Sequence, residues 1–261
     1  MCPEPSTARK ILTKRKQFLS LLTDEILTKP EIESRVDYCR STVNYAIRDL
    51  ESVGFVERVP DGFHATVTGQ IAEATFRRYE KCLRAICAST TGLETLPPSK
   101  TLPPAIFDDA VVVRPGPKRP DRPSCRLAEL IQSASMVRGC TPLVITRVIE
   151  TYYDKLSSSD FDLELVVESE VLTHLLMSYS DELGAIVASK RSRIYESSVS
   201  LPFGVMLANH GSNRVAVFIL SSTDGVKRLI VNDNLGSIAF AKGYFESHRA
   251  RASTLPGSEP A

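Results

Sequence analysis

The spacing of hydrophobic and polar positions near the N-terminus predicts two short helices separated by a tight turn. Thr28 and Glu31 have the spacing of a capping box, which marks the start of the first helix. Val43, Ile47 and Leu50 are spaced by four and three residues, which predicts the buried stripe of the second. The chain therefore reads as a helix, a turn and a second helix.

The pattern then changes from helical spacing to two β-prone runs. Gly54 stands where a helix commonly ends in a left-handed residue. Residues 55–59 and 63–67 favour strands, and Pro60-Asp61-Gly62 between them is a strong hairpin signal. The order of these elements resembles a winged helix-turn-helix, whose second helix enters the major groove of DNA.

The outward face of the second helix suits DNA recognition. Arginine can bond guanine, asparagine can pair with adenine, and hydroxyl groups reach phosphates or bases. The candidate DNA-binding residues are Arg40, Ser41, Thr42, Asn44, Tyr45 and Arg48 on the helix, with Arg58 and His64 beside the wing tip. Two alternatives remain open: a solvated polar face, and a winged helix that serves a protein-interaction scaffold.

Cys39 stands near the start of the predicted recognition helix, where many such motifs have Ser or Asp. A missing cap costs about 1 kcal/mol. Cysteine here is expected to be a small buried hydrophobe, and a redox sensor is the alternative.

Helical periodicity also flanks this unit. A helix with a basic start is expected over residues 8–22, after a disordered segment of residues 1–7. A further helix, which Thr68 can cap, is expected to run to about Ser89. Its apolar positions have heptad-like spacing: Ala72, Phe76, Tyr79, Leu83 and Ile86. This seam indicates a homodimer contact or packing on a second domain further along the chain.

Eight of the sixteen prolines fall between residues 96 and 123, which predicts a linker that passes into a first strand at residues 110–113. Helical and strand-like segments alternate beyond it. Helices are expected at 126–133, 145–156, 171–177, 181–188 and 238–251, and strands at 137–144, 161–167, 194–197, 205–208, 215–220 and 228–231, with a turn at Asp224-Gly225. This order predicts a mixed α/β sheet.

Composition limits the partners and the compartment. The net charge is +1, and residues 1–90 have 14 Lys and Arg against 12 Asp and Glu, so DNA affinity would depend on where charge lies. The six cysteines show no C-x-x-C or zinc-site spacing. The longest apolar run, Val215–Leu220, is far shorter than the ~20 residues of a membrane span. We expect a cytoplasmic protein with reduced thiols, no signal peptide, no membrane contact and no bound cofactor or metal.

Several short motifs together resemble an archaeal type of transcriptional regulator. They are RSTV at residues 40–43, VRG at 137–139, LPFGV at 201–205, and AFA at 239–241 with the tail 244–249. The C-terminal part is similar to the domain first named in methanogenesis regulators, and more loosely to the sensor domain of TrmB-type regulators. The resemblance covers roughly residues 8–252.

We therefore expect an α+β or α/β protein with four segments. They are a winged helix-turn-helix domain at 8–69, a connecting or dimerisation helix at 70–92, a proline-rich linker with a first strand at 93–123, and an α/β sensor or dimerisation domain at 124–252.

The sequence favours no enzyme. None of the four histidines begins the H-x-K motif of phospholipase-like chemistry, and no phosphate-binding or nucleophile-elbow motif occurs. The expected function is that of a transcriptional regulator that binds double-stranded DNA in a sequence-specific manner. A ligand or partner at the C-terminal domain is expected to control it, and a small-molecule effector would bind near the ends of the strands. Candidate effector residues are Arg138, Thr141, Phe203, Asn232 and Asp233, although a tight turn and a helix cap also explain the last three.

Overall fold

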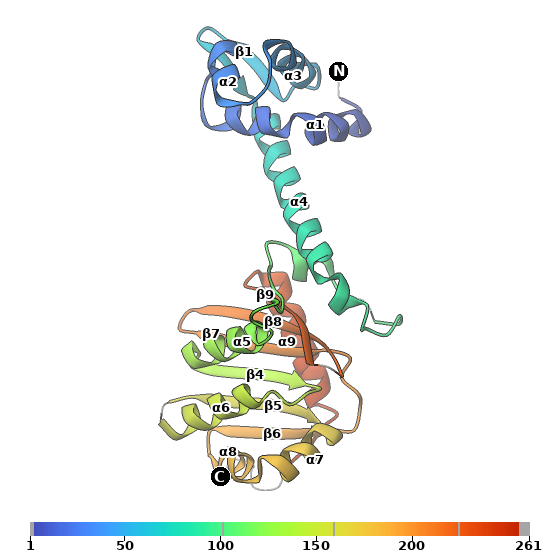
Figure 1. Ribbon diagram of the computed structural model, residues 1–261, viewed down its shortest axis with the longest axis vertical. Coiled ribbons are helices and arrows are strands. Elements are labelled where there is room, and N and C mark those ends of the chain that lie inside the picture. Colours follow the sequence, from blue (N-terminus) through green and yellow to red (C-terminus); the bar gives the residue numbers. More distant parts are fainter. Residues whose placement is uncertain (1–2, 101, 159, 224, 256–261) are drawn as a thin grey trace. The chain divides into compact units, whose positions relative to one another are not determined.

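The computed structural model describes residues 3–100, 102–158, 160–223 and 225–255. These residues form two compact units, residues 1–80 and 81–261, and helix α4 (Val67–Leu93) has residues in both. Each unit has its own hydrophobic core, and Figure 1 shows the helices and strands of both.

The first unit is a winged helix-turn-helix. Its elements are α1 (Pro5–Asp24), α2 (Lys29–Arg35), α3 (Arg40–Ser52), β1 (Val56–Val59), β2 (Gly62–Ala65) and the start of α4. The strands β1 and β2 pair in antiparallel fashion, and Leu27 adds one bridge to Phe63. The helix, turn, helix and hairpin follow in the order that the hydrophobic pattern predicted.

Local hydrogen bonds define where the helices of this unit begin. The backbone N–H and the hydroxyl of Thr28 both donate to the Glu31 carboxylate at 2.7 Å, as the capping-box spacing suggested. Helix α4 begins at Val67, and its cap is Thr66 rather than the expected Thr68. The Thr66 hydroxyl accepts the Gly69 N–H at 3.0 Å, so the second strand ends at Ala65 instead of residue 67.

One core holds this unit together. Helix α3 buries the predicted stripe together with Ala46, and α1 packs its own apolar face against α3. The buried side chains of this core include Phe18, Leu19, Leu22, Ile32, Val43, Ile47, Leu50, Phe55 and Phe63. Burial of a large apolar side chain stabilises a fold by about 1.5–3 kcal/mol, so this stripe sets how α3 is rotated.

Among the described residues of the second unit, eight strands form one mixed sheet, in the order β10-β6-β5-β4-β7-β8-β9-β3. Strands β4, β5 and β6 are mutually parallel. The pairs β4–β7, β7–β8, β8–β9 and β9–β3 are antiparallel. The strands are β3 (Val111–Val113), β4 (Met136–Thr141), β5 (Asp162–Glu168), β6 (Ser192–Ser197), β7 (Gly204–His210), β8 (Asn213–Ser222), β9 (Gly225–Asn232) and β10 (Ser253–Thr254).

Helices cover both faces of this sheet (Figure 1). They are η1 (Pro104–Phe107), α5 (Arg122–Ser133), α6 (Thr146–Ser158), α7 (Ser169–Ser178), α8 (Ser180–Ala188) and α9 (Leu235–Arg249). The larger core lies under α5 to α8, and a second core lies between the sheet, α9, η1 and the last turns of α4. The central strands therefore bury side chains on both faces, as expected for an α/β sheet.

The proline-rich stretch differs from the expected linker. Helix η1 buries Ile106 and Phe107, and β3 pairs with β9 as an edge strand. The side-chain amides of Asn232 and Asn234 donate to the Asp108 carbonyl at 2.7 and 2.9 Å and hold η1 against the sheet. Proline suits helix starts and sheet edges because its φ is fixed and it has no N–H to donate. A proline-rich composition therefore accompanies packed structure here.

Other boundaries also shift. Helix α1 begins at Pro5, so residues 5–7 are helical instead of disordered. Asn234 accepts the Ser237 N–H at 2.8 Å and starts α9 at Leu235, three residues before the expected start. The sequence did not predict β10. Asp224 of the expected turn lies outside the described residues.

Gly69 tests how closely α4 packs on the wing. A Cβ at this position would lie 1.9 Å from the Phe55 carbonyl oxygen, whereas a Cβ at Gly243 in α9 would meet nothing within 4 Å. We expect Gly69→Ala to lower the free energy of unfolding by about 2 kcal/mol, because the backbone must move. Gly243→Ala should raise it by about 0.5–1 kcal/mol through helix propensity. Urea unfolding followed by circular dichroism measures both, and equal effects of the two changes would contradict this packing.

Candidate nucleic-acid interface

The polar face of α3 is exposed along its first three turns. Arg40, Ser41, Tyr45 and Arg48 are exposed, and Thr42 and Asn44 are half-buried. Arg40, Asn44 and Arg48 follow one another at four-residue spacing and so share one stripe of the helix. The structure thus brings six of the eight predicted DNA-binding residues together on one surface.

This surface is positively charged and contains no acidic residue. Residues 40–48 contain two arginines and no Asp or Glu, and neither arginine forms an ion pair with any described residue. The Arg48 guanidinium lies 5.9 Å from the centre of the Tyr45 ring. Asp49, the next residue, is paired with Arg15 of α1 at 2.9 Å. The Arg15 guanidinium thereby neutralises the carboxylate that directly follows Arg48 in the sequence.

Cys39 is the N-cap residue of α3 and is exposed, so the expected buried hydrophobe is wrong. An N-cap residue has extended backbone geometry and directs its side chain outward, which its place in the sequence could have indicated. The Ser41 and Thr42 hydroxyls lie 3.1 and 3.2 Å from Sγ. Hydrogen bonds from Ser41 first, and then from Thr42, lower the pKa of the Cys39 thiol to about 7.

Arg58 and His64, the two DNA-binding candidates on the wing, do not lie on one surface. Glu57 pairs with His64, and Arg58 pairs with Phe63, in the register of the hairpin. Since neighbouring residues of a strand point to opposite faces, Arg58 and His64 lie on opposite faces of the wing. Arg58 is exposed and His64 is half-buried.

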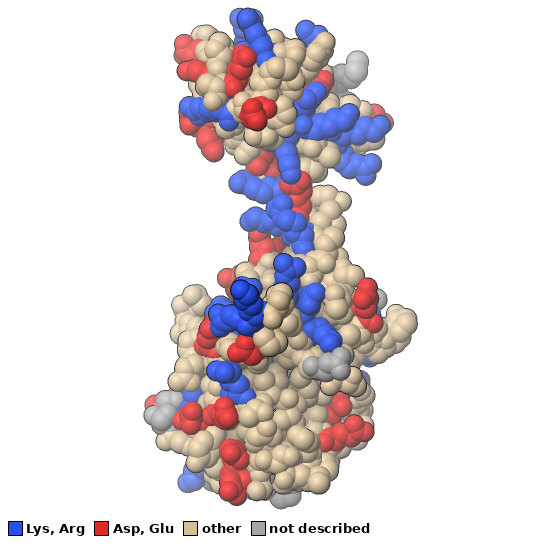
Figure 2. All heavy atoms as spheres, viewed as in Figure 1, with Lys and Arg blue, Asp and Glu red and all other residues tan. Residues whose placement is uncertain are grey.

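Helix α1 adds a second positive surface to this unit. Figure 2 shows Lys and Arg side chains gathered over α1. Arg9, Lys10 and Lys14 of this helix form no ion pair with a described residue, whereas Arg15 pairs with Asp49 and Lys16 with Glu80. Such a surface attracts phosphates without regard to base sequence.

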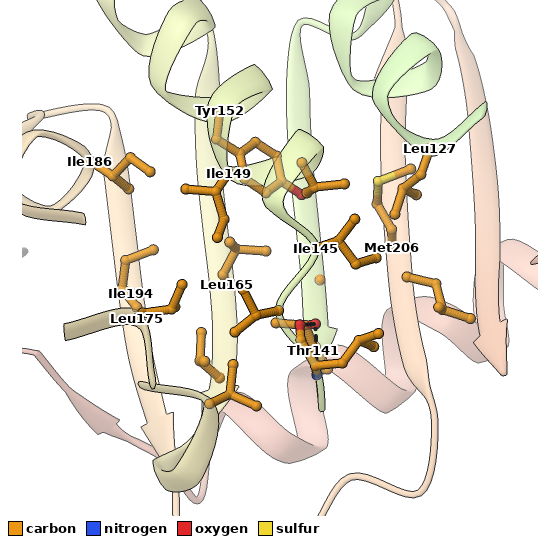
Figure 3. Close-up of a pocket in the computed structure, with 18 of the residues that line it drawn as sticks. Leu127, Thr141, Ile145, Ile149, Tyr152, Leu165, Leu175, Ile186, Ile194 and Met206 are labelled. Atoms are coloured by element: carbon orange, nitrogen blue, oxygen red, sulfur yellow. Dashed lines mark hydrogen bonds between the residues drawn. The ribbon is translucent and has the colours of Figure 1, made fainter. Parts of the chain in front are cut away.

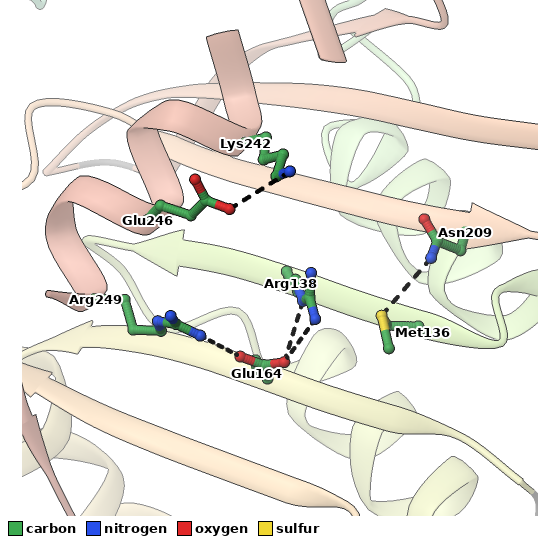
Figure 4. Close-up of polar contacts among 7 residues, drawn as sticks. All are labelled: Met136, Arg138, Glu164, Asn209, Lys242, Glu246 and Arg249. Atoms are coloured by element: carbon green, nitrogen blue, oxygen red, sulfur yellow. Dashed lines mark hydrogen bonds and ion pairs between the residues drawn. The ribbon is translucent and has the colours of Figure 1, made fainter. Parts of the chain in front are cut away.

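The candidate effector residues do not form one site in the second unit. Arg138 lies on the α9 face of the sheet, where its Nε donates to Glu164 at 3.1 Å, and Arg249 approaches the same carboxylate from α9 at 3.4 Å (Figure 4). Thr141 lies on the opposite face, because it is three residues further along β4. Its hydroxyl donates to the Leu143 carbonyl at 2.7 Å.

Two of the other three candidates, Phe203 and Asn232, have structural contacts. Phe203 is buried against the Tyr244 ring, with 4.7 Å between the ring centres. Asn232 is buried and holds η1, as described above, and its Oδ1 accepts the Asn234 N–H at 2.8 Å. Asp233 is exposed beside them. These contacts account for the conformation of the Asn232–Asn234 segment as a helix start.

Two absences hold for the residues that the structure describes. Within them, no group of three or more His, Cys, Asp or Glu residues could hold a metal ion. No helix formed by these residues has the length and apolar character needed to cross a membrane.

A winged helix-turn-helix unit with an exposed basic face, followed by an α/β unit, defines a two-domain regulator. The family model for the middle domain of methanogenesis regulatory protein FilR1 matches residues 120–251, and the model for the HVO_A0261 N-terminal domain matches residues 10–87. The chain belongs to the family of regulators that have this FilR1 middle domain. The resemblance drawn from the sequence motifs is thereby confirmed.

Several solved structures have a distant likeness to this chain. The archaeal chromatin protein TrmBL2 is similar over 94% of both chains, with 13% identity and a TM-score of 0.42. Nuc, a phospholipase D family member from Salmonella typhimurium, has 11% identity and a TM-score of 0.41 over 56% of this chain and 99% of its own. NucT from Helicobacter pylori has 11% identity and a TM-score of 0.44 over the same shares. No individually curated protein sequence matches the chain.

The hydrogen bonds around Cys39 predict its reactivity. Because the thiolate is the reacting form, alkylation by iodoacetamide should rise with pH through a midpoint near 7. Ser41→Ala removes one of the donors and should move this midpoint upward. Cys125 is the comparison within the same chain, because its hydrogen bond to Asp121 raises its pKa. Peptide mapping by mass spectrometry follows each site, and a midpoint at Cys39 no lower than that at Cys125 would contradict these contacts.

Proposed function

We propose that this protein is a transcriptional regulator that binds double-stranded DNA in a sequence-specific manner through α3. The observation that carries the proposal is the polar stripe of Arg40, Asn44 and Arg48, in which both arginines are exposed and Asn44 is half-buried, with no acidic residue among residues 40–48. The buried stripe on the other side of α3 fixes the orientation of these side chains.

The chemistry of the stripe fits base recognition. An arginine fork pairs with the two acceptors of guanine, and an asparagine amide pairs with the donor and acceptor of adenine. Ser41, Thr42 and Tyr45 beside the stripe have hydroxyl groups that suit phosphate contacts, which set the register of the helix on the duplex. Arg58 and His64, on opposite faces of the wing, would contact different parts of the duplex backbone or minor groove.

Affinity would come from local placement of charge. The chain as a whole has a net charge of +1, so it has no strong overall field to attract DNA. The basic residues of α1 and the two arginines of α3 belong to the same unit and supply positive charge there. Acidic residues elsewhere on the chain would oppose non-specific binding to DNA. Contacts with the bases would then determine which DNA sequence is bound.

A homodimer fits this function, since winged-helix regulators commonly bind two half-sites related by the symmetry of the protein. The seam expected on α4 is divided: Ala72 and Phe76 pack on the core of the first unit, whereas Tyr79 is 55% exposed. Ile71, Thr75 and Tyr79 form an exposed stripe at four-residue spacing, and Ile71 is 63% exposed. We assign the dimer contact to this stripe.

The second unit would control DNA binding by a ligand or a partner. A ligand that binds one conformation of this unit more tightly shifts the population and so the affinity for DNA. In this role the protein needs no catalysis of its own. The alternative, a scaffold whose winged helix contacts a protein, predicts little dependence of DNA binding on salt.

Two arginines provide the direct test. We expect Arg40→Ala and Arg48→Ala each to weaken specific binding by about 1–3 kcal/mol and to leave the unfolding transition unchanged. Arg126→Ala is the matched control, because Arg126 is an exposed arginine of the second unit paired only with Glu129. The operator would come from selection of bound sequences out of a random duplex pool with the full chain.

Salt dependence separates DNA binding from the scaffold. Binding to random duplex DNA should fall steeply as salt rises, because each phosphate contact releases a counterion. A flat salt response, or unchanged binding in both arginine variants, would remove α3 as the recognition helix.

A further inference from the structure

An apolar cavity of about 70 Å³ lies inside the second unit, between the sheet and α6, α7 and α8 (Figure 3). Its walls are aliphatic side chains from the sheet and the helices, including Ile145, Ile149, Leu165, Leu175, Ile194 and Met206. It lies where β4 and β5 end, beside the start of the antiparallel strand β7. Ligands of α/β sheets commonly bind at this end of the strands, where the chain changes direction across the sheet.

The cavity has a cause in the sequence. Gly139 pairs with Leu165 on one side and Met206 on the other, and all three positions face the cavity. Any other residue at position 139 would place a side chain between these two. A Cβ there would lie 2.7 Å from the Val205 carbonyl oxygen, so close approach of β7 favours glycine and leaves the space open.

One polar group in this wall has no partner. Tyr152 of α6 is 7% exposed, and Figure 3 shows its hydroxyl directed toward the middle of the cavity-lining side chains. No hydrogen bond to this hydroxyl is found among the described residues, and burial raises its pKa, so it stays protonated. The only other side-chain hydroxyl of the lining, that of Thr141, already donates to Leu143. A hydroxyl that faces an apolar cavity without a hydrogen-bond acceptor is costly, and a bound acceptor would remove that cost.

The wall between the cavity and solvent is a short loop. Leu143 and Val144 follow β4 and line the cavity on one side and two surface grooves on the other. Both residues are half-buried. Displacement of this loop would therefore open the cavity to a ligand without any change in the sheet.

We infer that this cavity is the ligand site of the second unit, and that it takes a small neutral molecule with an aliphatic body and one carbonyl oxygen that accepts the Tyr152 hydroxyl proton. The inference rests on the proposed function for its role as an effector site. Charged ligands are excluded by the cost of burying an ion among aliphatic side chains. A cavity of about 150 Å³ is enough for benzene, so this smaller one suits a molecule of a few carbons.

Two probes of equal shape test the carbonyl contact. In 2-methyl-1-butene a CH₂ group replaces the carbonyl oxygen of 2-butanone, so the probes differ only in the acceptor. Binding to the full chain is followed by ¹³C-methyl NMR at Met206, Ile149 and Ile194, with Ile47 of the first unit as the remote reference. We expect both probes to shift the cavity methyl groups and to leave Ile47 unchanged.

Tyr152→Phe removes only the hydroxyl. It should raise the dissociation constant of 2-butanone about 5- to 10-fold, the effect of one hydrogen bond, and leave that of 2-methyl-1-butene unchanged or lower. Tyr153→Phe is the matched control, because Tyr153 is 40% exposed and does not line the cavity. It should change neither constant.

Val167→Ile adds one methylene group at the cavity wall and should weaken both probes. Unfolding temperatures and the methyl spectrum of the first unit confirm that each variant is folded. The inference is overturned if neither probe shifts the cavity methyl groups, if Tyr152→Phe weakens the binding of both probes equally or of neither, or if Val167→Ile leaves the binding of both unaffected.

DNA binding by the same samples is measured separately. A chain that binds 2-butanone but no DNA contradicts the proposed regulator function, and a chain that binds DNA but neither probe contradicts the cavity site.

Discussion

The burial of Val43, Ala46, Ile47 and Leu50 fixes α3 against α1 and the wing, and the candidate DNA interface depends on this contact. A helix has one rotation that buries such a stripe, so the opposite side chains have no freedom to turn inward. The Arg15–Asp49 ion pair then neutralises the carboxylate that directly follows Arg48 in the sequence. Recognition chemistry is thus a consequence of packing, because the same hydrophobic contacts that stabilise the unit present the arginines to solvent.

Packing also determines which side chains of the second unit's sheet are buried, and here it acts on both faces of the sheet. Its central strands have helices on both faces, so side chains of neighbouring strands must fill the space on each side. On the α9 face Arg138, Glu164 and Arg249 satisfy one another (Figure 4). On the other face Gly139 contributes no side chain, and the space that remains is apolar with a single free donor. A site for an apolar ligand and a structural ion-pair cluster therefore lie on opposite sides of one strand.

Local patterns predicted much of the secondary structure, because capping, periodicity and turn chemistry act over a few residues. Thr28 and Glu31, the α3 stripe and the hairpin at Asp61-Gly62 are all present as expected. The pattern was wrong at two places: Thr66 rather than Thr68 caps α4, and η1 packs within the expected linker because Asn232 and Asn234 hold it, whereas the strand expected at residues 110–113 is present as β3. Those asparagines are more than 120 residues away along the chain, beyond any local signal.

The sequence by itself determined the winged helix-turn-helix, the identity of its polar face and the mixed α/β class of the second unit, since each follows from short-range spacing. Only the tertiary structure decided that Cys39 is exposed beside two hydroxyls, that Arg58 and His64 lie on opposite faces of the wing, and that the predicted effector residues are dispersed. It alone brought Tyr152 to a cavity beneath Gly139. A cavity is the space that many packed side chains leave between them. Those side chains come from distant parts of the sequence, so no local pattern of residues predicts the cavity.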